Sequence, residues 1–251
     1  MLIYYVRHGD PIYDPDMLTP LGEQQAAALA KRLAVFGVDE VFASTSNRAI
    51  QTAKPTCEML GLPLTTLDFL NENDLKGKLT VKGPDGTSHW VWAEPSHAAL
   101  LCSREVRELG DHWYTHPTFA PYAFEKAIKP IEEHIDRFLT SYGYEHDVEK
   151  GAYRITQRQP EKRIAIFAHE CVGKLFMSHV LDIPFPYYAA HFEMHTSGLS
   201  VIRFDDGTRK DPQKEPLPYA RARLLTLSND AHLYREDVSL LHRITNMREE
   251  Y

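Results

Sequence analysis

The alternation of strand and helix patterns within residues 2–61 is the feature that most constrains the fold of this chain. Short apolar runs at residues 2–6 and 38–43 are typical of buried strands, and each is followed by a segment with apolar residues at helical spacing. A strand–helix–strand–helix order implies a parallel sheet with helices packed against it. We therefore predict an α/β fold, a three-layer sandwich in which a mostly parallel sheet is flanked by helices.

Local signals mark where the two helices begin and end. Thr19 and Pro20 read as an N-cap followed by a first-turn proline, and Gly37 is a natural residue to follow the last turn. The run at residues 44–47, Ser-Thr-Ser-Asn, supplies caps for the second helix, which we expect to end at Gly61.

The remaining chain continues the α/β pattern around one irregular stretch. Residues 74–122 show little periodicity, and we interpret them as an insertion or cap after the fourth element, within a single domain spanning residues 1–251. Residues 142–161 are polar and predict an exposed hairpin, and the tail from residue 228 is polar with a helical stretch near its end. Further strands are predicted at 64–67, 163–168, 198–204 and 221–227, and further helices at 124–138 and 172–180.

Composition excludes some classes of function. The formal net charge of -7 argues against a protein that binds nucleic acid through a broad basic surface. No apolar run approaches the length of a membrane span, so we expect no membrane partner. Cys57, Cys102 and Cys171 are widely spaced without a CxxC pair, which argues against a disulfide framework or a zinc knuckle and favours a reducing cytoplasm.

Charged and imidazole side chains stand at three strand-to-helix junctions. Arg7 and His8 follow the first strand, Arg48 opens the helix after the second, and His169 follows the strand at residues 163–168. In a parallel sheet these junctions share one edge, where helix N-termini also point backbone N–H groups. Two Arg and two His at such an edge predict a pocket for a tetrahedral dianion, in which a neutral His attacks phosphorus and the other helps to neutralise the oxygens.

These motifs resemble the histidine phosphatase superfamily in its phosphoglycerate mutase-like branch, branch 1. The resemblance rests on Arg-His-Gly at residues 7–9, on Arg48 within its Ser-Thr-Ser-Asn-Arg segment, and on His169 after a hydrophobic strand. Residues 18–22 are similar to the family's segment before its first helix, and residues 228–233 to a C-terminal segment of its phosphatases. The middle of the chain carries no such similarity.

The resemblance implies a role for each of these residues. His8 would be the nucleophile that forms a phosphohistidine, and Arg7, Arg48 and His169 would hold the phosphoryl group, with His169 also counted as catalytic. Glu72, in Leu-Asn-Glu, matches the position of the proton donor to the leaving oxygen.

The resemblance also implies that no metal or other cofactor is needed, because the Arg side chains neutralise the phosphate charge. His8 and His169 could by residue type be metal ligands, but no carboxylate stands at ligand spacing to complete a set.

Two positions depart from the family pattern. Glu170 follows His169 where the family often has Gly, and a carboxylate there would repel substrate phosphate if it pointed into the pocket. Asp14 falls where many members place an Asn that helps to bind phosphate, so we include Asp14 among the predicted phosphate-binding residues. Either departure could alter substrate choice or lower the rate.

We predict a metal-independent phosphatase that hydrolyses a small phosphate monoester through phosphorylated His8. One alternative is phosphoryl transfer of the phosphoglycerate mutase type, for which Arg104 and Arg107 are candidate cap residues. Another is a catalytically weak sensor of a phosphorylated ligand on the same fold. The expected partner is a small phosphorylated substrate, and the sequence does not decide between a monomer and a homodimer.

Plainer interpretations stay open for single residues. Arg7 and His8 could form a structural ion pair with Asp10, and Arg48 could merely pair with Glu58 or with the turn at residues 39–40. The aromatic residues Trp90, Trp92, Trp113 and Tyr114 could line a pocket, although a small core of the insertion is the favoured interpretation. Residues 195–197 could edge the site, although a solvated loop is favoured.

Overall fold

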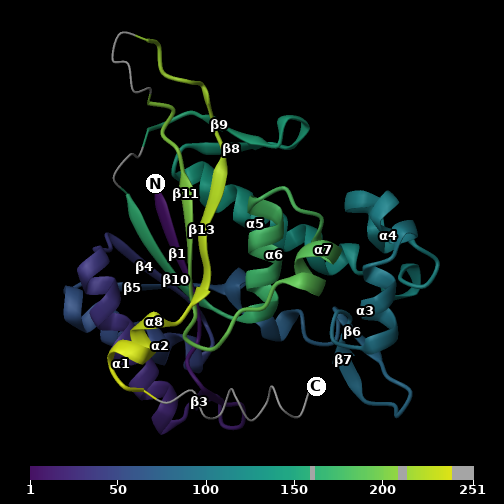
Figure 1. Ribbon diagram of the computed structural model, residues 1–251, viewed down its shortest axis with the longest axis horizontal. Helices are drawn as coiled ribbons and strands as arrows, with labels where there is room; N and C mark the ends of the chain where they lie inside the picture. The colour runs from purple at the N-terminus through teal and green to yellow at the C-terminus, as the bar shows by residue number, and fades with distance from the viewer. Residues whose placement is uncertain (159–161, 209–213, 239–251) are drawn as a thin grey trace.

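A six-stranded mixed sheet lies at the centre of the computed structural model, which describes residues 1–158, 162–208 and 214–238 (Figure 1). The strand order across the sheet is β13-β11-β1-β10-β4-β5. These strands are β1 (Leu2–Arg7), β4 (Glu40–Ser44), β5 (Leu64–Leu67), β10 (Arg163–Ala168), β11 (Leu199–Phe204) and β13 (Ala222–Asn229).

The strands that carry the predicted site run in one direction. β1 pairs with β10, β10 with β4 and β4 with β5, all in parallel. β11 is antiparallel to both of its neighbours, β1 and β13. The prediction of a mostly parallel sheet is therefore confirmed.

Helices cover both faces of the sheet, so the predicted three-layer arrangement is also confirmed (Figure 1). One face packs against α1 (Pro20–Phe36) and α2 (Asn47–Leu60), with α8 (Ala231–Arg235) beside α1. The other face packs against α5 (Glu125–Ser141), α6 (Glu170–Val180) and α7 (Phe185–His191).

The two faces follow from the alternation of side chains along each strand. On β1, Tyr4 and Val6 lie in one apolar cluster with Leu29 of α1, whereas Ile3 and Tyr5 lie in the cluster on the other face. All four β1 side chains are buried, as expected for a strand that is covered on both faces.

The predicted ends of the first two helices agree with the structure, except at one cap. Thr19 Oγ1 accepts a hydrogen bond of 3.0 Å from the Gly22 N–H, and Gly37 and Gly61 follow the helices with φ of 78° and 65°. Ser46 occupies the N-cap position of α2 but makes no side-chain cap bond. Its hydroxyl oxygen lies 3.1 Å from His169 Nε2 instead.

The segment predicted as an insertion builds an aromatic core with its neighbours. Trp113 is buried and stacks on Phe124 and Phe185 with ring centroids 5.4 and 5.7 Å apart. The favoured interpretation of Trp113 as a core residue is therefore confirmed, while the role of the segment as a cap stays a prediction. Its elements are β6 (Thr80–Lys82), β7 (Ser88–Trp90), α3 (Pro95–Leu101), α4 (Arg104–Glu108), η3 (Gly110–Thr115) and η4 (Ala120–Tyr122).

The predicted hairpin exists, and most of its described residues are exposed or half-buried as expected, but one face of it is buried. β8 (Tyr144–Asp147) and β9 (Ala152–Ile155) pair in antiparallel fashion, and β12 (Tyr219–Ala220) adds a third strand. Tyr144 and Tyr153 are buried, and each ring centroid lies 5.0 Å from that of Phe204. The segment is polar in composition, so its sequence does not reveal that these two tyrosines form an apolar inner face.

The remaining described elements are short: β2 (Pro11–Ile12), β3 (Met17–Leu18), η1 (Asp68–Leu70), η2 (Glu72–Asp74) and η5 (Val148–Lys150). Any helix near the end of the tail, beyond residue 238, lies outside the described residues. Within the described part of the chain, no helix is both long enough and apolar enough to cross a membrane.

Two glycines allow the loop after β1 to touch the first turn of α1. A Cβ atom on Gly22 would lie 2.2 Å from the Asp10 carbonyl oxygen, and one on Gly9 would lie 2.7 Å from the Gly22 carbonyl oxygen. Both contacts are with backbone atoms, so a larger residue would displace the loop that carries His8.

We expect Gly22→Ala to lower the free energy of unfolding by at least 1–3 kcal/mol, roughly the cost of overpacking. Gly61→Ala is the matched control, because a Cβ at Gly61 meets no atom within 4 Å and only the left-handed backbone is strained, at about 1–2 kcal/mol. Chemical denaturation of both variants measures the difference. A smaller loss for Gly22→Ala than for Gly61→Ala would contradict the close contact.

Candidate active site

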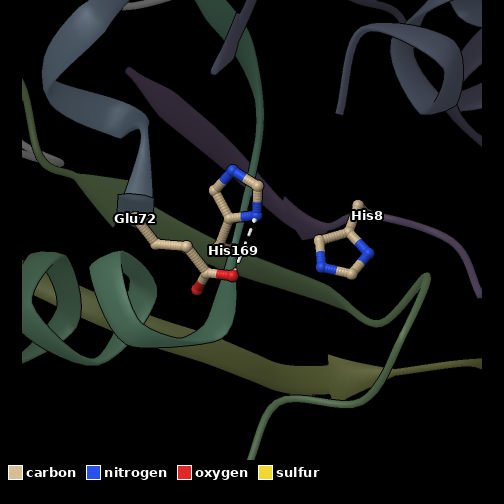
Figure 2. A group of neighbouring side chains, drawn as sticks. All are labelled: His8, Glu72 and His169. Atoms are coloured by element: carbon tan, nitrogen blue, oxygen red, sulfur yellow. Dashed lines mark ion pairs between the residues drawn. The ribbon is translucent and has the colours of Figure 1, made fainter. Parts of the chain in front are cut away.

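The carboxyl edge of the parallel strands brings together all the predicted site residues except Asp14. Arg7 ends β1 and His8 follows it, while His169 directly follows β10. Arg48 lies in the first turn of α2 after β4, and Glu72 begins η2 after β5. Figure 2 shows the side chains of His8, Glu72 and His169 gathered at this edge.

His8 is held as a neutral imidazole with one nitrogen free. The residue is 1% exposed, and its Nδ1–H donates to the Gly9 carbonyl oxygen at 2.7 Å, which leaves Nε2 as the unprotonated nitrogen. Burial and the neighbouring Arg7 lower the pKa of His8 from 6.5 to about 3. At neutral pH, His8 therefore offers a lone pair on Nε2.

His169 is also buried and neutral. Its Nδ1 accepts a hydrogen bond of 3.0 Å from Arg48 Nη2, so the proton is on Nε2, which lies 2.9 Å from Ser44 Oγ and 3.1 Å from Ser46 Oγ. Burial lowers the pKa of His169, and the nearby His8 and Arg48 lower it further. The His8 and His169 ring centroids are 5.2 Å apart.

Arg48 is the centre of a network at the edge of the site. Its Nη1 donates to Asp16 Oδ1 at 2.7 Å, and its Nη2 donates to Glu72 Oε1 at 2.8 Å as well as to His169. It therefore pairs with Asp16 and Glu72, and the alternative pairing with Glu58 was wrong.

Arg7 is paired with the unusual carboxylate that follows His169. Its Nη1 lies 2.7 Å from Glu170 Oε2 and donates to the Met194 carbonyl oxygen at 2.6 Å. Asp10 accepts a hydrogen bond from the Thr19 hydroxyl at 2.6 Å, and the ion pair of Arg7 is with Glu170.

Both guanidinium groups keep hydrogen-bonding capacity for an anion. The Nε atoms of Arg7 and Arg48 are buried, and neither has a hydrogen-bond acceptor among the described residues. A buried N–H group without an acceptor is costly, and an oxyanion placed between the two side chains would satisfy it.

Glu72 is placed to exchange a proton at this anion site. Its Oε1 lies 3.6 Å from His169 Nδ1 (Figure 2), and its side chain is 16% exposed. Burial raises the pKa of Glu72, while Arg48 and Arg7 act in the opposite direction. The net upward shift is the direction that a general acid requires.

The same geometry overturns one argument from sequence about metals. The ligand atoms of His8, Glu72 and His169 lie within 4.8 Å of one another, so the fold supplies the carboxylate that sequence spacing did not reveal. Arg7 and Arg48 nevertheless surround this group with positive charge, which favours an anion over a divalent cation.

Asp14 forms no hydrogen bond or ion pair with the other predicted residues in the described part of the chain. It is exposed in the loop between β2 and β3, and its contribution to phosphate binding stays a prediction. Asp16, two residues later, reaches the site instead: one of its oxygens pairs with Arg48, and the other accepts a hydrogen bond of 2.7 Å from the Asn47 N–H.

The sequence does not identify several polar residues that contact the site residues. Ser44 and Ser46 were interpreted as helix caps, yet their hydroxyls contact His169. The Ser197 N–H donates to the carbonyl oxygens of both Arg7 and His8 at 3.0 Å, and Ser197 is fully buried. The favoured interpretation of residues 195–197 as a solvated loop was therefore wrong at Ser197. The only signal for this was their position before a strand.

Comparisons with known proteins confirm the family resemblance. Residues 3–89 match the model of the histidine phosphatase superfamily (branch 1). A protein of Hydrogenobacter thermophilus named "Putative phosphoserine phosphatase 2" is 26% identical over 154 residues, which cover 57% of this chain and 68% of that protein.

Solved structures share the fold at lower identity. A mycobacterial glucosyl-3-phosphoglycerate phosphatase with inorganic phosphate superposes with a TM-score of 0.54 at 19% identity, covering 92% of this chain and 98% of the other. A mutant phosphoserine phosphatase from Entamoeba histolytica with phosphoserine gives 0.54 at 14% identity, over 92% and 98%. The α-ribazole phosphatase from Shigella flexneri gives 0.52 at 20% identity, over 92% and 97%.

We expect Glu170→Gln to tighten the binding of inorganic phosphate roughly three- to tenfold. Burial raises the pKa of Glu170, but Arg7 outweighs it and brings the pKa to about 2, so the carboxylate is ionised and competes with an anion for Arg7. Glu193→Gln is the control, since Glu193 contacts Lys174 at 3.2 Å, as Glu170 does at 3.3 Å. Calorimetric titration with phosphate measures the affinity of each variant. Equal affinities in the two variants would contradict the competition for Arg7.

We expect His8 to make the protein less stable in acid. Below pH 6.5 the unfolded chain binds a proton at His8, whereas the folded chain does so only near pH 3, so the free energy of unfolding falls as the pH falls between these values. Between pH 7 and pH 5, His8 alone lowers the free energy of unfolding by roughly 2 kcal/mol. The His8→Asn variant should lose that much less stability by chemical denaturation over this range. An identical pH dependence in both proteins would show that His8 is not held neutral.

Proposed function

Because residues 3–89 carry the sequence pattern of branch 1 of the histidine phosphatase superfamily, we propose that this protein hydrolyses a small phosphate monoester through phosphorylated His8. The observation that carries the proposal is the state of His8: a neutral buried ring whose Nδ1–H is fixed on the Gly9 carbonyl, beside two guanidinium groups with buried N–H groups to spare. A neutral Nε2 can attack phosphorus without first losing a proton.

In the first step, His8 Nε2 forms a bond to phosphorus while the bond from phosphorus to the ester oxygen breaks. Arg7 and Arg48 stabilise the charge on the phosphoryl oxygens, and Glu72 protonates the departing oxygen. His169 joins them once its Nδ1, released by Arg48, takes up a proton beside the phosphate dianion. To receive the substrate, Arg48 exchanges its present contact with Glu72 for a phosphoryl oxygen, which frees the Glu72 carboxyl for the leaving group.

In the second step, water attacks phosphorus, Glu72 takes its proton, and the bond to His8 Nε2 breaks. Inorganic phosphate leaves, and both Glu72 and His8 return to their starting states. Neither step requires a metal ion, since two cationic side chains and the protonated Glu72 carry the charge balance.

The related proteins support a phosphorylated small molecule as substrate. Those named above are described as acting on phosphoserine, glucosyl-3-phosphoglycerate and α-ribazole phosphate, which are chemically diverse. Phosphoryl transfer of the mutase type gains no support from Arg104, a candidate for its extra positive charge. This side chain is 86% exposed, and its Nε donates to Glu108 of the same helix.

The test is hydrolysis of p-nitrophenyl phosphate in EDTA by the full chain and by His8→Ala. We expect turnover that is lost in His8→Ala and retained in His112→Ala, a replacement of an exposed histidine. Phosphate incorporated from labelled substrate and trapped by an alkaline quench should map to His8. Turnover that persists in a folded His8→Ala protein would overturn the proposal.

A second comparison isolates Glu72. The Glu72→Gln variant should lose about 10²–10⁴-fold in rate with an alkyl phosphate, whose leaving oxygen needs a proton, and much less with p-nitrophenyl phosphate. Equal losses with both substrates would remove Glu72 from the role of proton donor.

A further inference from the structure

A second group of potential metal ligands lies away from the His8 site. Asp136 of α5, His146 of β8 and His179 of α6 each offer one ligand atom, and these atoms lie within 4.8 Å of one another. The three elements lie side by side in Figure 1, where the hairpin meets the two helices.

The three side chains converge on one carboxylate oxygen. Asp136 Oδ1 lies 3.3 Å from His146 Nδ1 and 2.8 Å from His179 Nε2. The two imidazole rings stand at 86° to each other with centroids 4.8 Å apart. Ligand atoms around a tetrahedral zinc ion are about 3.3 Å apart, so small side-chain movements would place all three around one ion.

One ring nitrogen in this group is deeply buried against a carboxylate. The His146 side chain is 3% exposed, and its Nδ1 lies 3.3 Å from Asp136 Oδ1 without a well-aligned hydrogen bond among the described residues. Burial lowers the pKa of His146, but Asp136 and Asp182 outweigh it and raise the pKa to about 9. A metal ion between His146 and Asp136 would take the place of the proton that His146 carries there.

Further carboxylates flank the outer nitrogens of both rings. His146 Nε2 donates to Asp182 Oδ1 at 2.9 Å. His179 Nε2 donates to Asp136 Oδ1 at 2.8 Å, and its Nδ1 lies 3.9 Å from Glu132 Oε1. A metal ion would displace the protons between the two rings and Asp136, and the outer nitrogens would keep their carboxylates. A histidine that binds metal through one nitrogen typically donates the other N–H to such a carboxylate.

We propose that Asp136, His146 and His179 bind a divalent transition-metal ion of the zinc class, with water in the fourth position. Asp182 and Glu132 orient the two histidines. Two imidazoles and one carboxylate form a ligand set typical of zinc, with one position open.

The charge around this group differs from that around His8. Three carboxylates lie within contact of the two rings, and the cation paired with them is Lys129, 2.9 Å from Glu132 Oε2. No Arg side chain pairs with Asp136, His146 or His179 within the described residues. The balance of charge therefore favours a cation.

The proposed site is separate from the His8 site and independent of the proposed hydrolysis. His179 lies near the C-terminal end of α6, ten residues after His169, which corresponds to about 15 Å along the helix. A bound ion would link α5 and α6 to the hairpin of β8 and β9, and its expected effect is on stability.

The test is titration of the metal-stripped full chain with Co²⁺, followed by visible absorption, and with Zn²⁺, followed by calorimetry. We expect one equivalent to bind per chain, with the visible bands of four-coordinate Co²⁺ and a higher melting temperature. Asp136→Asn and His179→Gln should abolish the bands. Asp182→Asn should weaken metal binding about 10–100-fold. This variant tests the site if Asp136→Asn and His179→Gln do not fold.

His8→Ala is the matched control, because it removes a ligand from the other group of His and Glu side chains. Binding that persists in His8→Ala and is lost in His179→Gln supports the site. Binding that is lost in His8→Ala and unchanged in His179→Gln overturns it, as does the absence of any binding by the folded wild-type chain. The latter result would leave His146 as an imidazolium between Asp136 and Asp182. Hydrolysis in EDTA should be unchanged in His179→Gln, so failure of one proposal is distinguishable from failure of the other.

Discussion

The parallel pairing of β1 with β10 is the contact on which the candidate active site depends. It sets Val6 beside Phe167 and Arg7 beside Ala168, and the His8 N–H donates to the Ala168 carbonyl oxygen at 2.9 Å. Since both strands end at the same level, the residues that follow them, His8 and His169, face each other. The pairing joins the first strand of the chain to one that follows more than half of the sequence, so its closure has a large entropic cost. Burial of both strands on both faces offsets that cost.

Around the two histidines, charge rather than shape determines what the site can bind. Burial lowers the pKa of both imidazoles, and Arg7 and Arg48 lower it further, so the site resists both a proton and a metal cation. Glu170 and Glu72 balance these guanidinium groups in the absence of an anion. The second cluster reverses the signs: its histidines are surrounded by carboxylates, of which Asp136 lies between the two rings. Two groups of similar residue types thus favour opposite ligands.

Much of the fold could be predicted from local patterns, because strands, helices and their caps are encoded by neighbouring residues. Thr19, Gly37 and Gly61 marked helix ends correctly, and the apolar run at residues 163–168 is β10. Errors arose where a side chain has a distant partner. Ser46 occupies the N-cap position of α2, but its hydroxyl contacts His169. The mostly exposed hairpin buries Tyr144 against Phe204 of β11, a partner that the residues around Tyr144 do not reveal.

The sequence by itself determined which groups can perform the chemistry and at which sheet edge they stand. Arg7 ends a strand and His8, Arg48 and His169 follow strands in a parallel α/β pattern, and that order alone places them together. Only the tertiary structure decided that Asp16 pairs with Arg48, that Glu170 turns to Arg7, and that a separate cluster of His and Asp side chains forms at the far end of α6. These contacts join side chains from separate elements, and their geometry depends on how the elements pack, which no local periodicity records.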